Sequence, residues 1–265
     1  MTDRAYVIDS DEECERLEAQ ARLAHISSHL KYLPLKPGMS VLDAGCGSGS
    51  MTRQIAAAES GATVVGVDLR EPYLDFARRN AESENLTNVT FEKGDVGALP
   101  FPDATFDIVW HKYLLQWVGD PQAAMTEFAR VTKPGGLIVS CSFDSFGMIN
   151  EPPDPVIQPL AEHLFSQSAD LFIGRRMARM SQEAGLVDIR VAMEVDNVFT
   201  VVGRIDVERR RNWEIQFKAG REHAIKQLGS AAMADAFADI FMRYQDREDT
   251  ASYCTLFFVS GRKPT

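Results

Sequence analysis

The stretch 40–50, SVLDAGCGSGS, limits what this chain can fold into more than any other part of the sequence. It opens with the apolar pair Val41 and Leu42, and a helical pattern begins at Met51. Between them, glycine stands at every second position. This order predicts a buried strand, a tight turn and a helix start. Because glycine adopts positive φ and has no Cβ, a ligand can approach this backbone closely, and we expect a nucleoside there.

An acidic residue ahead of the glycines indicates the charge of that nucleoside. Dinucleotide-binding turns carry G-x-G-x-x-G and hold a pyrophosphate at the helix N-terminus. Here Gly45 and Gly47 fit that pattern, but Ser50 takes the third position and Asp43 precedes the turn. A carboxylate repels a pyrophosphate and attracts an ammonium or sulfonium group. The turn therefore favours a positively charged nucleoside without phosphates.

The segment VLDAGCGSG resembles the first motif of class I S-adenosylmethionine (SAM) dependent methyltransferases. Three further stretches within roughly the first 140 residues resemble later motifs of that family in the same order. The resemblance implies an α/β fold: a Rossmann-like, doubly wound, seven-stranded and mostly parallel sheet with an antiparallel last strand and helical lid and cap insertions. It implies SAM as the cofactor and S-adenosylhomocysteine as the product. It also implies cofactor contacts in the loop from Asp43, Ala44, Gly45, Gly47 and Gly49.

A second acidic residue, Asp68, ends the predicted strand 63–67. A carboxylate at that place in the fold meets the ribose hydroxyls of a bound nucleoside. The alternative is that Asp68 caps the predicted helix 71–82. Leu69 is then expected to flank the adenine.

The stretch GDVGALPF, which begins at Gly94, resembles the family motif that reads the adenine edge. That edge needs one hydrogen-bond acceptor beside one donor. The Asp95 side chain and the Val96 amide supply this pair, so Gly94, Asp95 and Val96 are expected to bind the cofactor.

The N-terminal region 9–33 has helical spacing and a capping box. In resembling enzymes such a helix covers the cofactor, which implies that Tyr6 and Gln20 reach its methionine end. A solvated helix flanking the sheet is the alternative.

His111 follows the predicted strand 106–110, at the edge where open parallel sheets bind ligands. We expect it to contact the cofactor and to act as general base, because imidazole titrates near neutral pH. The alternative is that it contributes only packing or backbone contacts. Tyr113 is the second expected catalytic residue. The expected substrate-binding residues are aromatic and gather near the same edge: Tyr113, Trp117, Phe143 and Phe146.

The 265 residues, 45% of them hydrophobic, suit a single domain spanning 1–265. We divide it into an N-terminal helical cover (1–35), a SAM-binding core (36–142), a lid (144–174) and a helical cap insertion before the last strand (197–250). Two helices, 207–228 and 231–244, are expected in the cap. Caps on such folds set substrate choice.

Composition excludes several functions. The 28 Lys and Arg against 38 Asp and Glu give a net charge of −10, which disfavours nucleic acid as a partner. No apolar run reaches the roughly 18 residues of a membrane helix, and no signal core is visible, so we expect a cytoplasmic protein without membrane contact. The four cysteines lack metal-site spacing, so no metal is expected. Oligomeric state stays open, a homodimer being one alternative.

The function these features favour is SAM-dependent methyl transfer to an oxygen, nitrogen or carbon nucleophile of a small, apolar or aromatic metabolite, as in secondary metabolism. In-line displacement needs mainly positioning and the removal of water and a proton. The first alternative is a SAM-binding protein that does not transfer the methyl group, such as a cyclase or a sensor. A nicotinamide-dependent oxidoreductase and a macromolecular methyltransferase are further alternatives.

Overall fold

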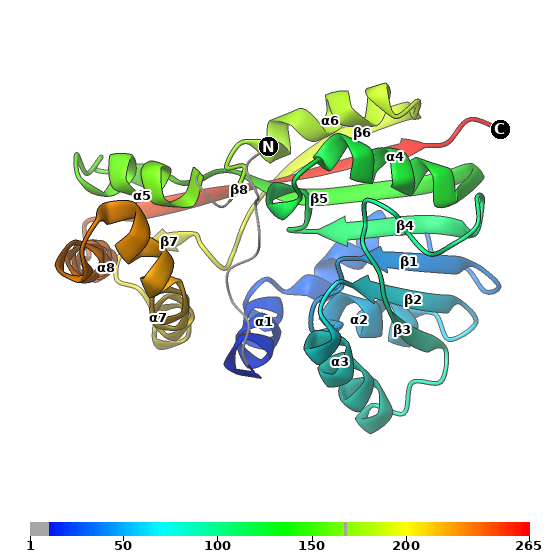
Figure 1. Cartoon of the computed structure of the whole chain (residues 1–265), viewed down its shortest axis with the longest axis horizontal. Coiled ribbons are helices and arrows are strands. Elements are labelled where there is room, and N and C mark those ends of the chain that lie inside the picture. Colours follow the sequence, from blue (N-terminus) through cyan, green and yellow to red (C-terminus); the bar gives the residue numbers. More distant parts are fainter. Residues whose placement is uncertain (1–10, 167–168) are drawn as a thin grey trace.

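The computed structural model describes residues 11–166 and 169–265, without the side chains of residues 11, 12 and 146–148. Its centre is one mixed sheet (Figure 1). Along the sheet the order is β3 (Val89–Lys93), β2 (Thr63–Asp68), β1 (Ser40–Ala44), β4 (Phe106–Lys112), β5 (Thr132–Glu151), β8 (Ala251–Arg262) and β6 (Val187–Val195).

The first five of these strands are parallel, and β8 is antiparallel to both β5 and β6. The expected mixed α/β sheet with an antiparallel last strand is confirmed. The expected number of seven strands is one too few, because β7 (Val201–Val202) also pairs with β8.

Helices cover both faces of the sheet, which explains why its central strands read as continuous apolar runs. On one face, Val41 and Ile108 pack with α2 (Ser50–Ala58) and the 3-10 helix η1 (Ile26–Tyr32). On the other face, their chain neighbours Leu42 and Val109 pack with two helices. These are α4 (Pro121–Val131) and α6 (Ile173–Glu183). Near the β3 edge, α3 (Glu71–Ser83) packs on β2 and β3.

The expected lid 144–174 begins as a strand. Ile149, Asn150 and Glu151 of β5 pair with Tyr253, Ser252 and Ala251 of β8, after a break in register that follows Asp144. The second half of the segment contains a helix, α5 (Ile157–Ser166).

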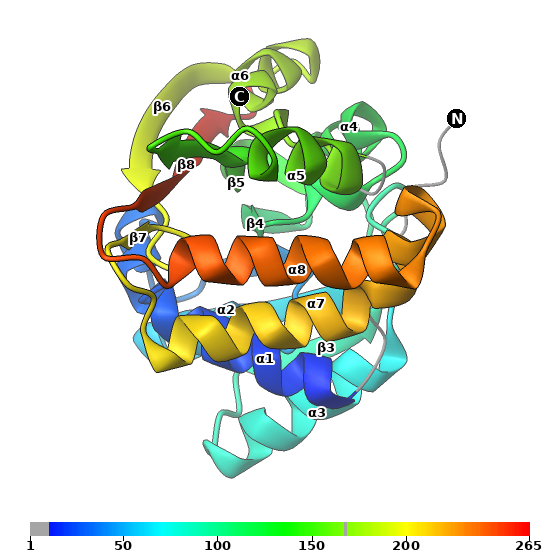
Figure 2. The same ribbon diagram turned by 90° about the vertical axis from the view of Figure 1, so that its left-hand side faces the viewer.

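The cap is a pair of helices beyond the carboxyl ends of the parallel strands (Figure 1). Figure 2 shows α7 (Val207–Leu228) and α8 (Ala231–Gln245) side by side, with α5 on one flank and α1 (Asp11–Leu23) on the other. Their bounds follow the predicted ones because local signals fix them. Asp206 accepts hydrogen bonds from the first turn of α7, Gly229 ends α7 with a φ of 82°, and Ser230 accepts from Met233 N.

Candidate cofactor and acceptor site

The three loop glycines all have left-handed backbones, with φ of 70° at Gly45, 54° at Gly47 and 74° at Gly49. A Cβ on Gly45 would lie 2.6 Å from a methyl group of Leu114, just past the end of β4. A Cβ on Gly47 would meet only Leu17 of α1, at 3.5 Å. Packing therefore requires glycine at Gly45, whereas Gly47 leaves room between the loop and α1.

Asp68 fastens this loop to the end of β2. Its Oδ2 accepts from Gly47 N at 2.9 Å and its Oδ1 from Arg70 N at 3.0 Å. The N-cap alternative for Asp68 is wrong, because Arg70 holds the N-cap position of α3 without a side-chain cap bond. Burial raises the pKa of Asp68, and these amide bonds oppose the rise. A carboxylate has about four lone-pair sites, so Asp68 can accept further hydrogen bonds.

The residues beside Asp68 form the rest of the expected nucleoside site. Leu69 is 62% exposed, which leaves its side chain available for contact. At the end of the neighbouring strand β3, Gly94 N donates to Asp68 O at 3.0 Å. Asp95 is exposed and its Oδ1 accepts from Gly97 N at 2.8 Å, whereas the side chain of Val96 is buried. The structure thus brings both expected nucleoside-reading segments to adjacent strand ends.

Asp43 lies beneath the loop and is 3% exposed. Thr52 of α2 donates a hydrogen bond of 2.6 Å to its Oδ2. Burial raises the pKa of Asp43 to about 7, the Thr52 bond opposes this rise, and Asp68 adds to it. The carboxylate that the charge argument expected to attract a positively charged nucleoside is thus almost wholly enclosed by protein. Asp43 instead joins β1 to the first turn of α2, and Ala44 beside it is fully buried.

Helix α1 lies over the glycine loop. Arg53 of α2 pairs with Glu18 of α1 at 2.8 Å and donates to Ser48 O in the loop at 2.8 Å. Gln20 faces away from this contact: its Oε1 accepts from Arg16 at 2.6 Å, and Arg16 also donates to Asn212 of α7 at 3.1 Å.

Gln20 thus belongs to a buried polar link between α1 and the cap. Tyr6, the other expected contact of the methionine end, lies outside the described residues.

His111 is fully buried on the α4 side of the sheet. Its Nε2 lies 2.7 Å from Ser140 Oγ, its ring centroid lies 5.1 Å from that of Phe128, and burial lowers its pKa to about 3. This geometry favours the packing alternative over the general-base interpretation. Side chains alternate along a strand, so His111 shares the covered face of Val109.

Tyr113, just beyond β4, has a φ of 54° and donates its hydroxyl hydrogen bond to Asp196 Oδ2. Asp196 is fully buried and also accepts from Val198 N at 2.6 Å. Burial raises the pKa of this carboxyl. Sequence reasoning missed Asp196, since nothing in the sequence links it to a tyrosine far along the chain.

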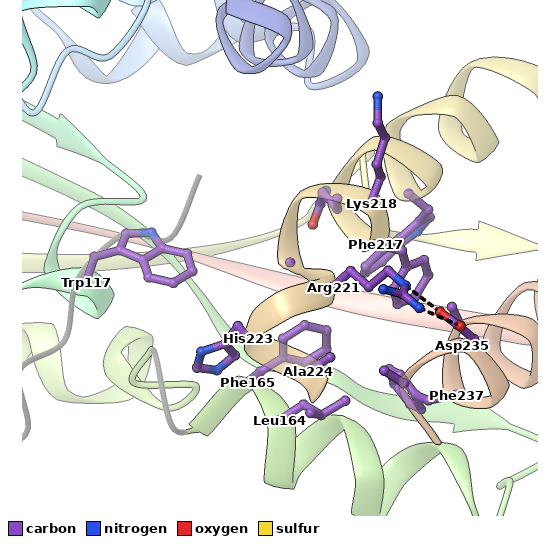
Figure 3. A pocket seen from close by; sticks show the side chains of 15 residues that line it. Trp117, Leu164, Phe165, Phe217, Lys218, Arg221, His223, Ala224, Asp235 and Phe237 are labelled. Carbon is purple, nitrogen blue, oxygen red and sulfur yellow. Dashed lines mark hydrogen bonds and ion pairs between the residues drawn. The ribbon is translucent and has the colours of Figure 1, made fainter. Parts of the chain in front are cut away.

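The remaining expected substrate residues separate. Phe143 is buried in the core, with its ring centroid 5.8 Å from that of Tyr113. The side chain of Phe146 lies outside the described ones. Trp117, at the end of η2 (Leu115–Trp117), lines a cavity of about 380 Å³ under the cap (Figure 3). The other side chains in its lining come from α5, α7 and α8.

Within 11–166 and 169–265, no three His, Cys, Asp or Glu side chains gather as they would around a metal ion. In the same ranges, no helix combines the length and the apolar character needed to span a bilayer.

Comparison with known proteins gives an uncharacterised relative and methyltransferases. An uncharacterised 37.1 kDa protein of a Streptomyces fradiae transposon is 32% identical over 205 residues, 76% of this chain and 59% of that protein. A demethylmenaquinone methyltransferase of Tropheryma whipplei is 38% identical over 113 residues, 43% of this chain and 45% of that enzyme. The matches thus span about half the length of these relatives.

The solved structure of the YcgJ protein of Bacillus subtilis has the same fold, with a TM-score of 0.64 at 21% identity over 91% of this chain and 99% of that one. A family model described as a methyltransferase domain matches residues 35–185, more than half of the chain. The chain therefore belongs to the methyltransferase domain family.

Proposed function

We propose that this chain binds SAM across the glycine loop and transfers its methyl group to an oxygen, nitrogen or carbon nucleophile of a small, apolar or aromatic metabolite. The observation that carries the proposal is the loop itself, where three left-handed glycines are held by the carboxylate of Asp68 through Gly47 N. When bound, SAM supplies an activated methyl group on its sulfonium.

The residues present fit this cofactor. Asp68 has lone pairs left for the ribose hydroxyls, Leu69 offers an exposed apolar surface to the adenine, and Asp95 can accept from the adenine amine beside the Val96 amide. Leu17 of α1 borders the space beside Gly47, so this helix can cover a cofactor bound across the loop. We assign Tyr113 and Trp117, which follow β4, to the part of the site that binds the methyl acceptor.

The test is calorimetric titration with S-adenosylhomocysteine, followed by incubation with methyl-labelled SAM. We expect micromolar binding, weakened in Asp68→Ala by about 1–3 kcal/mol through loss of the ribose bonds. Asp75→Ala, which removes an exposed carboxylate of α3, is the control and should bind as wild type. Absence of binding at millimolar ligand defeats the proposal. Binding with products that never carry label instead supports the non-transferring alternative.

We propose in addition that Tyr113 passes the acceptor's proton toward Asp196. A hydroxyl bonded to a buried carboxylate of raised pKa can relay a proton to it. Tyr113→Phe should lower kcat at least tenfold for a hydroxyl acceptor, with the affinity for S-adenosylhomocysteine unchanged. Tyr253→Phe, an exposed tyrosine of β8, serves as the control. An undiminished kcat in Tyr113→Phe would remove Tyr113 from the chemistry.

A further inference from the structure

The cavity under the cap has a definite chemical character. We propose that it binds the methyl acceptor, and that this acceptor is a neutral, flat aromatic molecule carrying oxygen substituents; this inference rests on the proposed methyl transfer. The volume of about 380 Å³ lies in the lower part of the roughly 300–1,000 Å³ range of small-molecule sites. The occupant is therefore a molecule of a few rings.

Aromatic side chains form the walls of this cavity (Figure 3). Trp213 and Phe217 of α7 stack with ring centroids 5.6 Å apart, and Phe217 meets Phe237 of α8 edge to face at 5.9 Å. Phe165 of α5 and Trp117 of η2 complete the aromatic lining. Flat, rigid walls of this kind favour a flat occupant through stacked and edge contacts.

Charged side chains of the lining do not select an ion. Arg221 is held by Asp235 through two bonds, of 2.7 and 2.8 Å, so the two charges neutralise each other. Lys218 is exposed, and Figure 3 shows it directed away from the aromatic rings. An anion among the aromatic walls would lose its hydration, and the Arg221–Asp235 pair has no net charge to offset that loss. The occupant is therefore neutral.

Two nitrogen atoms in this lining can form hydrogen bonds with oxygen atoms of the occupant. Gln216 Nε2 and His223 Nε2 are buried and have no hydrogen-bond partner among the residues that the structure describes. A buried polar atom without a partner destabilises the site, and a ligand that pairs with it removes that cost. The two residues are seven positions apart, which places them on one face of α7 about 10 Å from each other. An elongated aromatic molecule with an oxygen near each end pairs both atoms.

A glycine in the middle of α7 keeps this face open. Gly220 lies between Gln216 and His223, and a Cβ on it would meet nothing within 4 Å. Glycine inside a helix is less stable than alanine, and contacts with the described residues do not require it here. We therefore infer that the occupant fills the space beside Gly220.

The test uses 2,6-dihydroxynaphthalene as the probe, with naphthalene and naphthalene-2,6-dicarboxylate as comparators. Full-length protein saturated with S-adenosylhomocysteine is titrated into each by calorimetry. We expect the diol to bind at least tenfold more tightly than either comparator. Equal binding of the diol and naphthalene, or tighter binding of the dicarboxylate, overturns the inference.

Variants assign the binding to this cavity. Gln216→Leu and His223→Leu should each reduce the preference for the diol over naphthalene at least threefold, and Gly220→Leu should abolish binding of both. Lys226→Leu, which adds the same side chain at an exposed position of α7 outside the lining, should behave as wild type. A Gly220→Leu protein that binds the diol like wild type places the site elsewhere and overturns the inference.

Binding of S-adenosylhomocysteine distinguishes a failure of the acceptor inference from a failure of the proposed function. Every variant should retain it, which also shows that the variant folds. If wild type binds S-adenosylhomocysteine but shows no preference for the diol, the acceptor inference fails and the proposed function stands. If wild type fails to bind S-adenosylhomocysteine, the proposed function itself fails.

Discussion

At the scale of single residues, Asp43 carries a cost that depends on pH. An ordinary aspartate in an unfolded chain has a pKa of about 3.9, and burial raises that of Asp43 to about 7 in the folded protein. At a pH between these two pKa values, Asp43 is protonated in the folded state and ionised in the unfolded state. Stability from this group is complete below about pH 3.9, falls as pH rises toward 7 and then stays at its lowest level.

Asp43→Asn should remove this dependence and keep an oxygen that accepts from Thr52. The free energy of unfolding of wild type, measured relative to the variant, is expected to drop by roughly 2 kcal/mol between pH 5 and pH 8, at no more than about 1.4 kcal/mol per pH unit. Urea denaturation at several pH values measures it. The exposed Asp75→Asn is the control, and a parallel course of wild type and Asp43→Asn would contradict the assigned burial effect.

Residue chemistry was predictable from the sequence where one local geometry allows few residue types. Positive φ at Gly45 and Gly47 follows from their alternation with small residues, and the place of Asp68 follows from the strand before it. The position of His111 at the end of β4 was predictable, whereas its burial beside Phe128 depends on the packing of α4 on the sheet. Asp196 depends on a contact between distant segments, which no single-sequence pattern contains.

At the scale of elements, α1 depends on a side chain of another helix for its place over the loop. Arg53 is 5% exposed and joins Glu18 of α1, Ser48 O of the loop and Glu84 at the end of α3. Glu18 Oε1 is already buried without a partner. Loss of the guanidinium therefore leaves a carboxylate of α1 poorly compensated in a partly buried site.

Arg53→Met should destabilise the fold by about 2–4 kcal/mol and speed hydrogen exchange in α1 more than in α4. Arg79→Met, on the exposed face of α3, is the matched control. Exchange monitored by mass spectrometry reads the two helices separately. Unchanged protection of α1 would mean that Arg53 does not hold this helix in place.

The element bounds were predictable to the extent that caps determine them. The predicted helices 207–228 and 231–244 match α7 and α8, whose ends carry Asp206, Gly229 and Ser230 as caps. The continuation of β5 to Glu151 was missed, because its second half is fixed by pairing with β8, about 100 positions later in the chain.

At the scale of the whole molecule, the sheet and the cap share one hydrophobic core. Trp110 of β4 and Trp213 of α7 belong to the same cluster of buried side chains. Tyr244 of α8 also donates to Pro152 O at 2.9 Å, just after β5. With no separate core of its own, the cap is expected to unfold together with the sheet, and we infer that the chain behaves as one domain.

Two single-tryptophan proteins test this cooperativity, because they report from opposite ends of that core. One keeps Trp110 in the sheet and the other keeps Trp213 in the cap, with the remaining tryptophans replaced by phenylalanine. In each protein, the urea midpoint from tryptophan fluorescence should equal the midpoint from far-ultraviolet circular dichroism, and S-adenosylhomocysteine should shift both by the same amount. A Trp213 transition at clearly lower urea than the loss of helix and sheet signal would show that the cap opens by itself. The shared cluster would then be too weak to couple the acceptor cavity to the cofactor loop.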